Sequence, residues 1–468
     1  MYTFKNADTT WFLEDPSLEH VVEHLALEPR DKRAHFIREH NNAKIFIKFF
    51  HERGLPGLVR NRVLSRGKKE YGLSNRLRLL DVLTPRALGY GISTNGSYAL
   101  HEWIEGEPLI KWIDDPKRRQ QLLSSLVWLL QELKTKGVRH DDLHLANIIG
   151  SSGKLYLVDL HSITLKPNFT LADDVSNTTH ALAMIYDGMD EIEKQWFFGH
   201  YGGSALRTAV EEELGRFKKR WVTRKAARAF RTTSVLDAAG DRVIVRGMED
   251  QAHGKRIATI KKDRKVTVER YADHVRKTYA HARRLHRAWK NHVILEYMRL
   301  WIAPRAFYLH HASYSEPGYI AMEDLTGRGE ELDRYLDRNY DGMSRPGQRG
   351  FVEALSSFLV SILKKGVTHR DLKACNIFVL QRGAFLLLDV EDLDFSGFDE
   401  RALKRMLIQL NTTIPKRISL RDRLRFFSKI MRRLSLDGRL LLKGIASESH
   451  SREIVYEGVG GLKRESWG

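Results

Sequence analysis

The sequence has a single cysteine, Cys375, and no apolar stretch long enough to span a membrane. One thiol permits no disulfide within the chain, and zinc ribbons or iron–sulfur clusters need several clustered thiolates. The strongest apolar run, residues 122–133, is interrupted by two serines and a glutamine. The N-terminus also lacks the basic-then-apolar pattern of a signal peptide. These absences predict a protein of a reducing compartment, cytoplasmic or peripheral to a membrane.

The composition is that of a globular protein with an excess of positive charge. The chain has 468 residues, 42% of them hydrophobic, which suits two domains or three small ones. Its net charge of +19 should attract polyanions such as nucleotides, phosphorylated substrates, an anionic membrane face or nucleic acid. Charge alone does not choose among these partners. Nucleic acid is not expected, because no nucleic-acid-binding module accompanies the charge.

The chain contains an internal repeat whose unit is about half of its length. Residues 137–148 recur as residues 366–377, with Asp371 following Asp142 by 229 positions. The apolar segment 154–160 recurs downstream as 384–390, and residues 83–87 recur upstream as 302–306. Three features repeated in one order predict two domains, residues 1–232 and 233–468.

Local patterns predict the same order of elements in both copies. In the first copy, strands are expected over residues 35–38, 43–50 and 98–102 and a helix over 67–80. A stripe of leucines predicts a second helix over residues 118–136, ended by Gly137. A polar loop (140–147) and a strand (155–158) follow, and the second copy repeats this order, with its helix over 351–365. We therefore predict an α+β chain in which a β-rich lobe precedes a helical lobe, twice.

The polar loop has the pattern that phosphoryl transfer requires. A central aspartate can accept the hydrogen bond of an attacking hydroxyl, and an asparagine and a second aspartate supply hard oxygen ligands for Mg²⁺. Aspartate and asparagine also cap turns in proteins of many kinds, but the repetition of the whole pattern argues against that reading. The two sets are Asp142, Asn147 and Asp159 in the first copy, and Asp371, Asn376 and Asp389 in the second.

The phosphate-binding lysine is predicted in the first copy alone. Lys48 lies in an apolar strand and Glu70 in the next expected helix, where the two can pair and hold ATP phosphates. The alternative is a lysine at a sheet edge and a solvated glutamate. When the second copy is aligned on Pro304, Glu269 and Trp289 stand at these positions, so its clamp is predicted to be lost. Neither copy contains a G-x-G-x-x-G loop.

Together these motifs resemble the lipopolysaccharide kinases of the Kdo/WaaP family, over about residues 30–230 and 240–435. The resemblance implies two tandem protein-kinase-like bilobal domains. It further implies the catalytic bases Asp142 and Asp371, a clamp made by Lys48 and Glu70, and the metal ligands Asn147, Asp159, Asn376 and Asp389. The sequence departs from the family pattern at Asp141, which replaces the usual arginine. It also lacks the glycine that the family has two residues after the aspartates at Asp159 and Asp389.

The predicted activity is phosphorylation of a sugar hydroxyl of the lipopolysaccharide core, or of a similar glycolipid, with ATP and Mg²⁺ (or Mn²⁺). The alternatives are a protein Ser/Thr kinase and a pseudokinase scaffold with one inactive copy. Basic segments end both copies, over residues 216–231 and 401–436. The second contains an amphipathic helix that suits either the core of a lobe or an anionic membrane. The implied location is the cytoplasm, at the inner face of the bacterial inner membrane.

Overall fold

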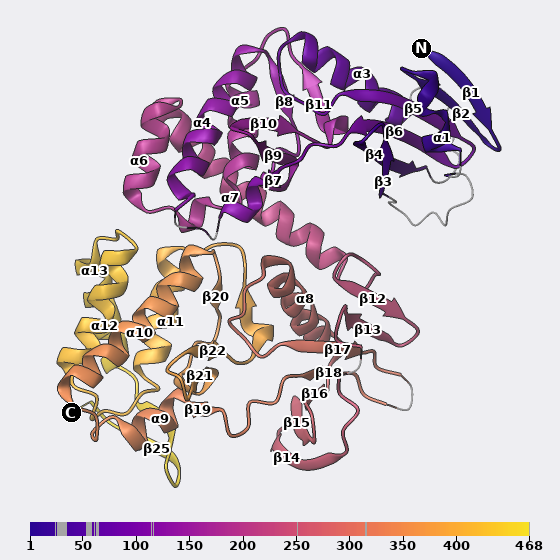
Figure 1. Cartoon of the computed structure of the whole chain (residues 1–468). Helices are drawn as coiled ribbons and strands as arrows, with labels where there is room; N and C mark the ends of the chain where they lie inside the picture. The colour runs from indigo at the N-terminus through magenta and orange to yellow at the C-terminus, as the bar shows by residue number, and fades with distance from the viewer. Residues whose placement is uncertain are drawn as a thin grey trace. The chain divides into compact units, whose positions relative to one another are not determined.

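The computed structural model describes residues 1–23, 25, 35–52, 59, 61, 65–113, 115, 117–249, 251–313 and 316–467. The chain divides into two compact units, Met1–Phe217 and Lys218–Gly468 (Figure 1). Both units contain helices and antiparallel strands, so the chain is α+β as the sequence predicts. No helix within the described residues is long and apolar enough to cross a membrane.

The first unit begins with an antiparallel sheet that carries the predicted strand lysine. Among the described residues its order is β1-β2-β5-β6-β4-β3. The strands are β1 (Tyr2–Asn6), β2 (Thr9–Leu13), β3 (His35–His40), β4 (Ala43–His51), β5 (Ala87–Ser93) and β6 (Gly96–Glu102). Ile45, Ile47 and Phe49 of β4 are buried in a cluster that includes the short helix α1 (Glu19–Val22). The strand also contacts helix α3 (Arg66–Leu79).

A helical part completes the first unit. Its helices are α4 (Arg119–Thr135), α5 (Leu171–Leu182), α6 (Glu191–His200) and α7 (Gly203–Ala227), the last of which runs into the second unit. The leucine stripe of α4 is buried in the largest core cluster of this unit. Short strands carry the polar loop: β8 (Val138–His140), β9 (Ile148–Ser151), β10 (Lys154–Leu157) and β11 (Ile163–Leu165), with β7 (Glu107–Pro108) beside β9.

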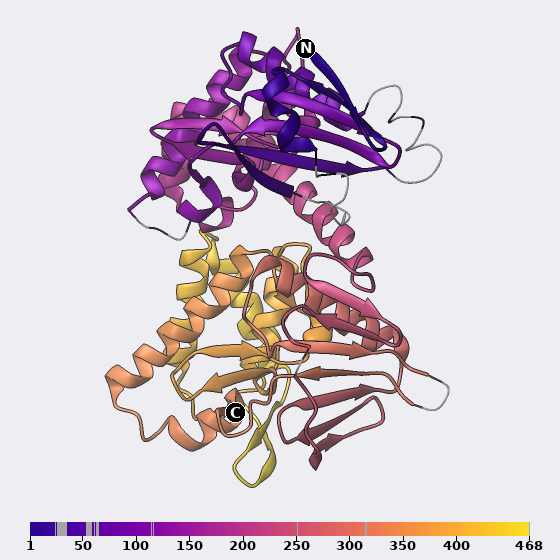
Figure 2. The same ribbon diagram turned by 45° about the vertical axis from the view of Figure 1, so that its right-hand side comes forward.

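Within the residues that the structure describes, the second unit repeats this sheet with one strand more. Its order is β12-β13-β17-β18-β16-β15-β14, which matches the first sheet strand for strand up to the extra edge strand β14. The strands are β12 (Leu236–Ala239), β13 (Arg242–Val245), β14 (Arg256–Lys262), β15 (Val266–Tyr271), β16 (Val275–Tyr279), β17 (Ala306–His310) and β18 (Tyr319–Met322). Figure 2 shows β14 and β15 as a hairpin at the end of this sheet.

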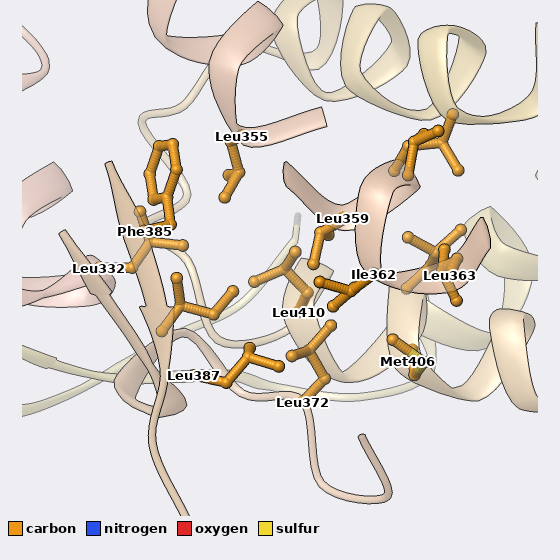
Figure 3. Close-up of a cluster of buried hydrophobic side chains, with 14 of the residues drawn as sticks. Leu332, Leu355, Leu359, Ile362, Leu363, Leu372, Phe385, Leu387, Met406 and Leu410 are labelled. Carbon is orange, nitrogen blue, oxygen red and sulfur yellow. The ribbon is translucent and has the colours of Figure 1, made fainter. Parts of the chain in front are cut away.

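The helical part of the second unit packs around one apolar cluster. Its helices are α8 (Ala282–Met298), beside the sheet, and α9 (Leu332–Asn339), α10 (Arg345–Lys364), α11 (Glu400–Asn411), α12 (Leu420–Arg433) and α13 (Gly438–His450). Figure 3 shows Leu359 of α10, Leu410 of α11 and Leu387 of a short strand pointing into the cluster. The remaining strands are β19 (Gly329–Glu331), β20 (Thr368–His369), β21 (Ile377–Leu380), β22 (Phe385–Leu387), β23 (Leu393–Asp394), β24 (Ile454–Gly458) and β25 (Gly461–Glu465).

The amphipathic helix of the second basic segment is α12, and its apolar face belongs to the core. Phe426, Phe427, Ile430 and Met431 are buried in the cluster of the second unit. The cations Lys429 and Arg433 both form ion pairs with Glu353 of α10. Of the two predictions for this helix, the core of a lobe or an anionic membrane, the packing supports the core.

Candidate active site

A cavity of about 310 Å³ in the first unit is lined by four of the five site residues that the sequence predicts in that unit. Strand β4, helix α3 and the segment after β10 each contribute to its wall. Lys48, Glu70, Asn147 and Asp159 all line it. Asp142 does not: its carboxylate is about half exposed, on the loop that also carries Asn147.

Lys48 and Glu70 meet in this cavity as the sequence predicts. Lys48 pairs across the sheet with Ala99 of β6, which directs its side chain toward α3. Its Nζ lies 3.4 Å from Glu70 Oε2, and both side chains are largely buried. Ser65 caps the start of α3 by accepting a hydrogen bond from the Lys68 N–H. A capped, packed helix thus holds the glutamate beside the lysine.

Asp159 supplies a second carboxylate to the same lysine. Its carboxylate forms an ion pair with Lys48, and His161 Nδ1 lies 2.7 Å from its Oδ1. Burial opposes its charge, but His161 and Lys48 hold the pKa of this carboxyl well below its ordinary value. The backbone of Asp159 is left-handed (φ 62°, ψ 51°), which is unfavourable for a residue other than glycine. Strain of this kind is often found at functional positions.

The polar loop is tied to the same strand end by hydrogen bonds. The Asp142 N–H donates to His140 Nδ1 at 3.2 Å, and Asn147 Nδ2 donates to the Asp142 carbonyl at 3.0 Å. The Val158 N–H donates in turn to the Asn147 carbonyl at 3.0 Å. His140 is buried, and burial lowers its pKa to about 4, so the ring is neutral and able to accept. The loop therefore fixes Asn147 beside Asp159 and leaves the Asp142 side chain open.

Two histidines belong to this site that sequence reasoning missed. His101 Nε2 lies 3.5 Å from Glu70 Oε1, and the ring of His161 faces Asp159. One ligand atom from each of Glu70, Asp159 and His161 lies within 4.8 Å of the others, a spacing at which a metal ion fits. The sequence signal for His161 was its position two residues after the strand-end Asp159, but no general motif contains a histidine there.

In the second unit the strand lysine is present, which corrects the alignment on Pro304. Lys277 of β16 pairs with Ile320 of β18 in the register that joins Lys48 to Ala99 in the first unit. Glu269 lies on the neighbouring strand β15, 2.7 Å from Arg256 Nε. Fewer residues separate Lys277 from Pro304 than separate Lys48 from Pro85. An alignment that counts back from Pro304 therefore matches Lys48 to a residue of the preceding strand, β15.

The carboxylate that partners Lys277 comes from a different element than Glu70. The predicted Trp289 is one residue off: counted back from Asp81 and Arg299, the left-handed residues that end the two helices, the position of Glu70 is held by Ala288. Trp289 beside it is fully buried and donates to the Ala229 carbonyl. Instead, Lys277 Nζ lies 3.0 Å from Glu391 Oε2 and 2.6 Å from Asp389 Oδ1. Glu391 follows Asp389 by two residues, at the position of His161 in the first unit. The ion pairs of Lys277 are therefore made by the turn after the strand.

Further contacts keep this second cluster charged. Glu391 is buried and also accepts hydrogen bonds from Arg284 Nε at 3.0 Å and the Tyr279 hydroxyl at 3.3 Å. Burial opposes the charge of Lys277, but Tyr279, Asp389 and Glu391 raise its pKa overall. Burial likewise opposes the charge of Asp389, and Lys277 lowers the pKa of that carboxyl.

The three hydrogen bonds that tie the polar loop to the strand end recur in the second unit. The Asp371 N–H donates to His369 Nδ1 at 3.2 Å, Asn376 Nδ2 donates to the Asp371 carbonyl at 2.8 Å, and the Leu388 N–H donates to the Asn376 carbonyl at 2.8 Å. Asp389 has the same left-handed backbone as Asp159 (φ 50°, ψ 54°). Both halves thus place the predicted residues in one local geometry.

Comparison with known proteins adds little to this geometry. The sequence matches no family model and no curated protein. Among solved structures it is similar to one described as WaaP in complex with acyl carrier protein, with a TM-score of 0.33 and 19% sequence identity. The match covers 47% of this chain and 98% of that one. A TM-score of this size marks a distant likeness and does not establish a common fold.

Proposed function

We propose that the chain is an ATP- and Mg²⁺-dependent kinase that phosphorylates a sugar hydroxyl of the lipopolysaccharide core or of a similar glycolipid. One observation carries this proposal. In each unit a buried lysine on the sheet forms ion pairs with a left-handed aspartate after a short strand and with a second acid. Phosphoryl transfer needs such a cation beside metal-binding oxygens. The proposed domains are residues 1–232 and 233–468, each protein-kinase-like and bilobal.

The residues of the first unit suit the roles that the reaction requires. Lys48, positioned by Glu70, would hold the phosphates of ATP. Asp159 and Asn147 offer the hard oxygen atoms that Mg²⁺ prefers, and the low pKa of Asp159 keeps it ionised. When bound, the metal neutralises charge on the phosphates. Lys277, Glu391, Asn376 and Asp389 would serve the second unit in the same way.

Asp142 and Asp371 would orient the attacking hydroxyl. The hydroxyl oxygen forms a bond to the γ-phosphorus while the bond from that phosphorus to the β–γ bridging oxygen breaks, which releases ADP. The proton of the hydroxyl passes to the aspartate. Both carboxylates are partly exposed, as is needed to reach an acceptor outside the buried ion pairs.

The acceptor is proposed from motif resemblance and from charge. A net charge of +19 suits a phosphorylated glycolipid at an anionic membrane surface. The proposed location is therefore cytoplasmic, at the inner face of the bacterial inner membrane. A protein Ser/Thr kinase would use the same residues on a different acceptor.

Transfer of labelled phosphate from [γ-³²P]ATP tests the proposal. The purified full chain is expected to label lipopolysaccharide core and not a generic protein substrate. The double variant Asp142→Asn/Asp371→Asn should lose activity by about 10²–10⁴-fold, the usual contribution of a general base. Asp141→Asn is the matched control, because Asp141 is the adjacent exposed acid and pairs with Arg139.

The single variants Asp142→Asn and Asp371→Asn, assayed separately, assign the activity to the first unit, to the second unit or to both. Labelling of protein in place of the glycolipid would favour the protein-kinase alternative. Undiminished transfer by the double variant would contradict the roles of both aspartates.

A further inference from the structure

The second unit has a cationic cavity that the proposed transfer does not explain. Its volume is about 950 Å³, and it lies between the β14–β15 turn, the start of α8 and the polar loop. We refer to it as the basin. Its polar wall consists of Lys265, His281, Arg283, Arg284, Arg287, Asp371 and Asp392.

The two cationic segments of the basin are held together by the backbone. The Ala280 N–H donates to the Lys265 carbonyl at 3.0 Å, which joins the end of the hairpin turn to the residues that precede α8. Asp263 closes the turn by accepting from the N–H groups of Lys265 and Val266. Lys265 and Arg283 are therefore fixed on neighbouring parts of one wall.

The acids of the basin already have partners, whereas two of its cations do not. Arg287 lies 3.2 Å from Asp392, and Lys373 lies 3.0 Å from Asp371. Within the described part of the chain, the side chains of Lys265 and Arg283 form no ion pair or hydrogen bond, and both residues are exposed. The basin therefore keeps positive charge that is available to a ligand.

We infer that the basin binds a phosphorylated acceptor, a saccharide carrying two or more phosphate groups. Arginine and lysine side chains converging from two segments suit phosphate oxygens, which guanidinium groups bind in pairs. The volume is within the range of small-ligand sites. Asp371 lies in the same wall, so a bound ligand would present a hydroxyl to it. That last step rests on the proposed function, whereas binding itself does not.

Isothermal titration calorimetry of the full chain with fructose 1,6-bisphosphate tests the inference, with fructose as the unphosphorylated control. Titrations are made with and without a saturating non-hydrolysable ATP analogue and Mg²⁺. We expect the bisphosphate to bind in both conditions and fructose not to bind. Because binding needs no turnover, this result is independent of the transfer assay.

The variant Lys265→Gln/Arg283→Gln should bind the bisphosphate about tenfold more weakly. Lys364→Gln/Lys365→Gln removes the same charge from an exposed helix end and should bind as the wild type does. No binding by the wild type, or equal binding by the basin variant, would overturn the inference. Abolition of binding by the ATP analogue would also overturn it, because the basin would then be the nucleotide-phosphate site.

Discussion

Glu391 is the residue on which the charge balance of the second site depends. Its buried carboxylate faces Lys277, Arg284 and the Tyr279 hydroxyl. Removing one partner of a buried ion pair leaves the other charges uncompensated, which is far more costly than losing an exposed pair.

Replacement of this carboxylate should therefore destabilise the second unit. Glu391→Gln is expected to lower the free energy of unfolding by about 3–5 kcal/mol. Asp392→Asn, one residue further on, breaks the more exposed pair with Arg287 and should cost about 0–1 kcal/mol. Denaturant unfolding of both variants measures the difference. Equal losses would show that Glu391 is not the central partner of Lys277.

Single residues also mark the limit of sequence reasoning. Lys48 and Glu70 could be paired from the sequence, because a lysine in an apolar strand and a glutamate in the next helix form a local pattern. Glu391 could not, because its role depends on the absence of a helix glutamate more than a hundred positions away. The left-handed backbone of Asp159 and Asp389 is likewise invisible in composition.

At the scale of elements, α12 shows how an amphipathic pattern is resolved by packing. Its ring pair Phe426 and Phe427 lies with centroids 5.5 Å apart inside the core. Leu424 on the same helix is 46% exposed. The two kinds of position should respond differently to truncation.

Phe426→Ala should lower the free energy of unfolding by about 3–5 kcal/mol, through lost burial and the cavity left behind. Leu424→Ala, the control on the same helix, should cost under about 1 kcal/mol, because little of its surface leaves water on folding. Thermal unfolding of both proteins provides the measurement. If Leu424→Ala were the more damaging, the outer face of α12 would have to be an interface.

Elements with strong local signals were predicted closely. The helix expected over residues 118–136 is α4 (Arg119–Thr135), and Gly137 follows it in the left-handed conformation (φ 64°). An added Cβ at Gly137 would lie 2.2 Å from the Lys166 carbonyl oxygen, so the position requires glycine. The order of strands in the sheets was not predictable, because hydrogen-bonded neighbours such as β2 and β5 are far apart in the sequence.

At the scale of the whole molecule, one buried acid sets part of the pH dependence of stability. Asp333 of α9 accepts hydrogen bonds from the N–H groups of Arg334 and Glu457. Burial outweighs these bonds and raises its pKa to about 6. Because the folded pKa exceeds the unfolded value, the contribution of this group is full below about pH 4 and is lost as pH rises through 6.

The asparagine of the Asp333→Asn variant cannot ionise, so this variant should not lose stability as the pH rises through 6. Relative to the wild type, the variant should therefore gain up to about 3 kcal/mol in unfolding free energy between pH 4 and pH 7. Denaturant titrations at several pH values measure this difference. The exposed Asp341→Asn is the control, and a pH-independent difference for Asp333→Asn would contradict the assignment.

The two halves differ in what their lysines depend on. In the first, Glu70 and Asp159 come from separate elements, so a displacement of α3 would uncouple the lysine from one carboxylate and leave the other. In the second, Asp389 and Glu391 are two residues apart on one turn, and Arg284 and Asn291 of α8 bind that turn, so a displacement of α8 would act on both acids together. A shift of the helix beside the sheet would thus change one carboxylate partner of the lysine in the first half and both in the second.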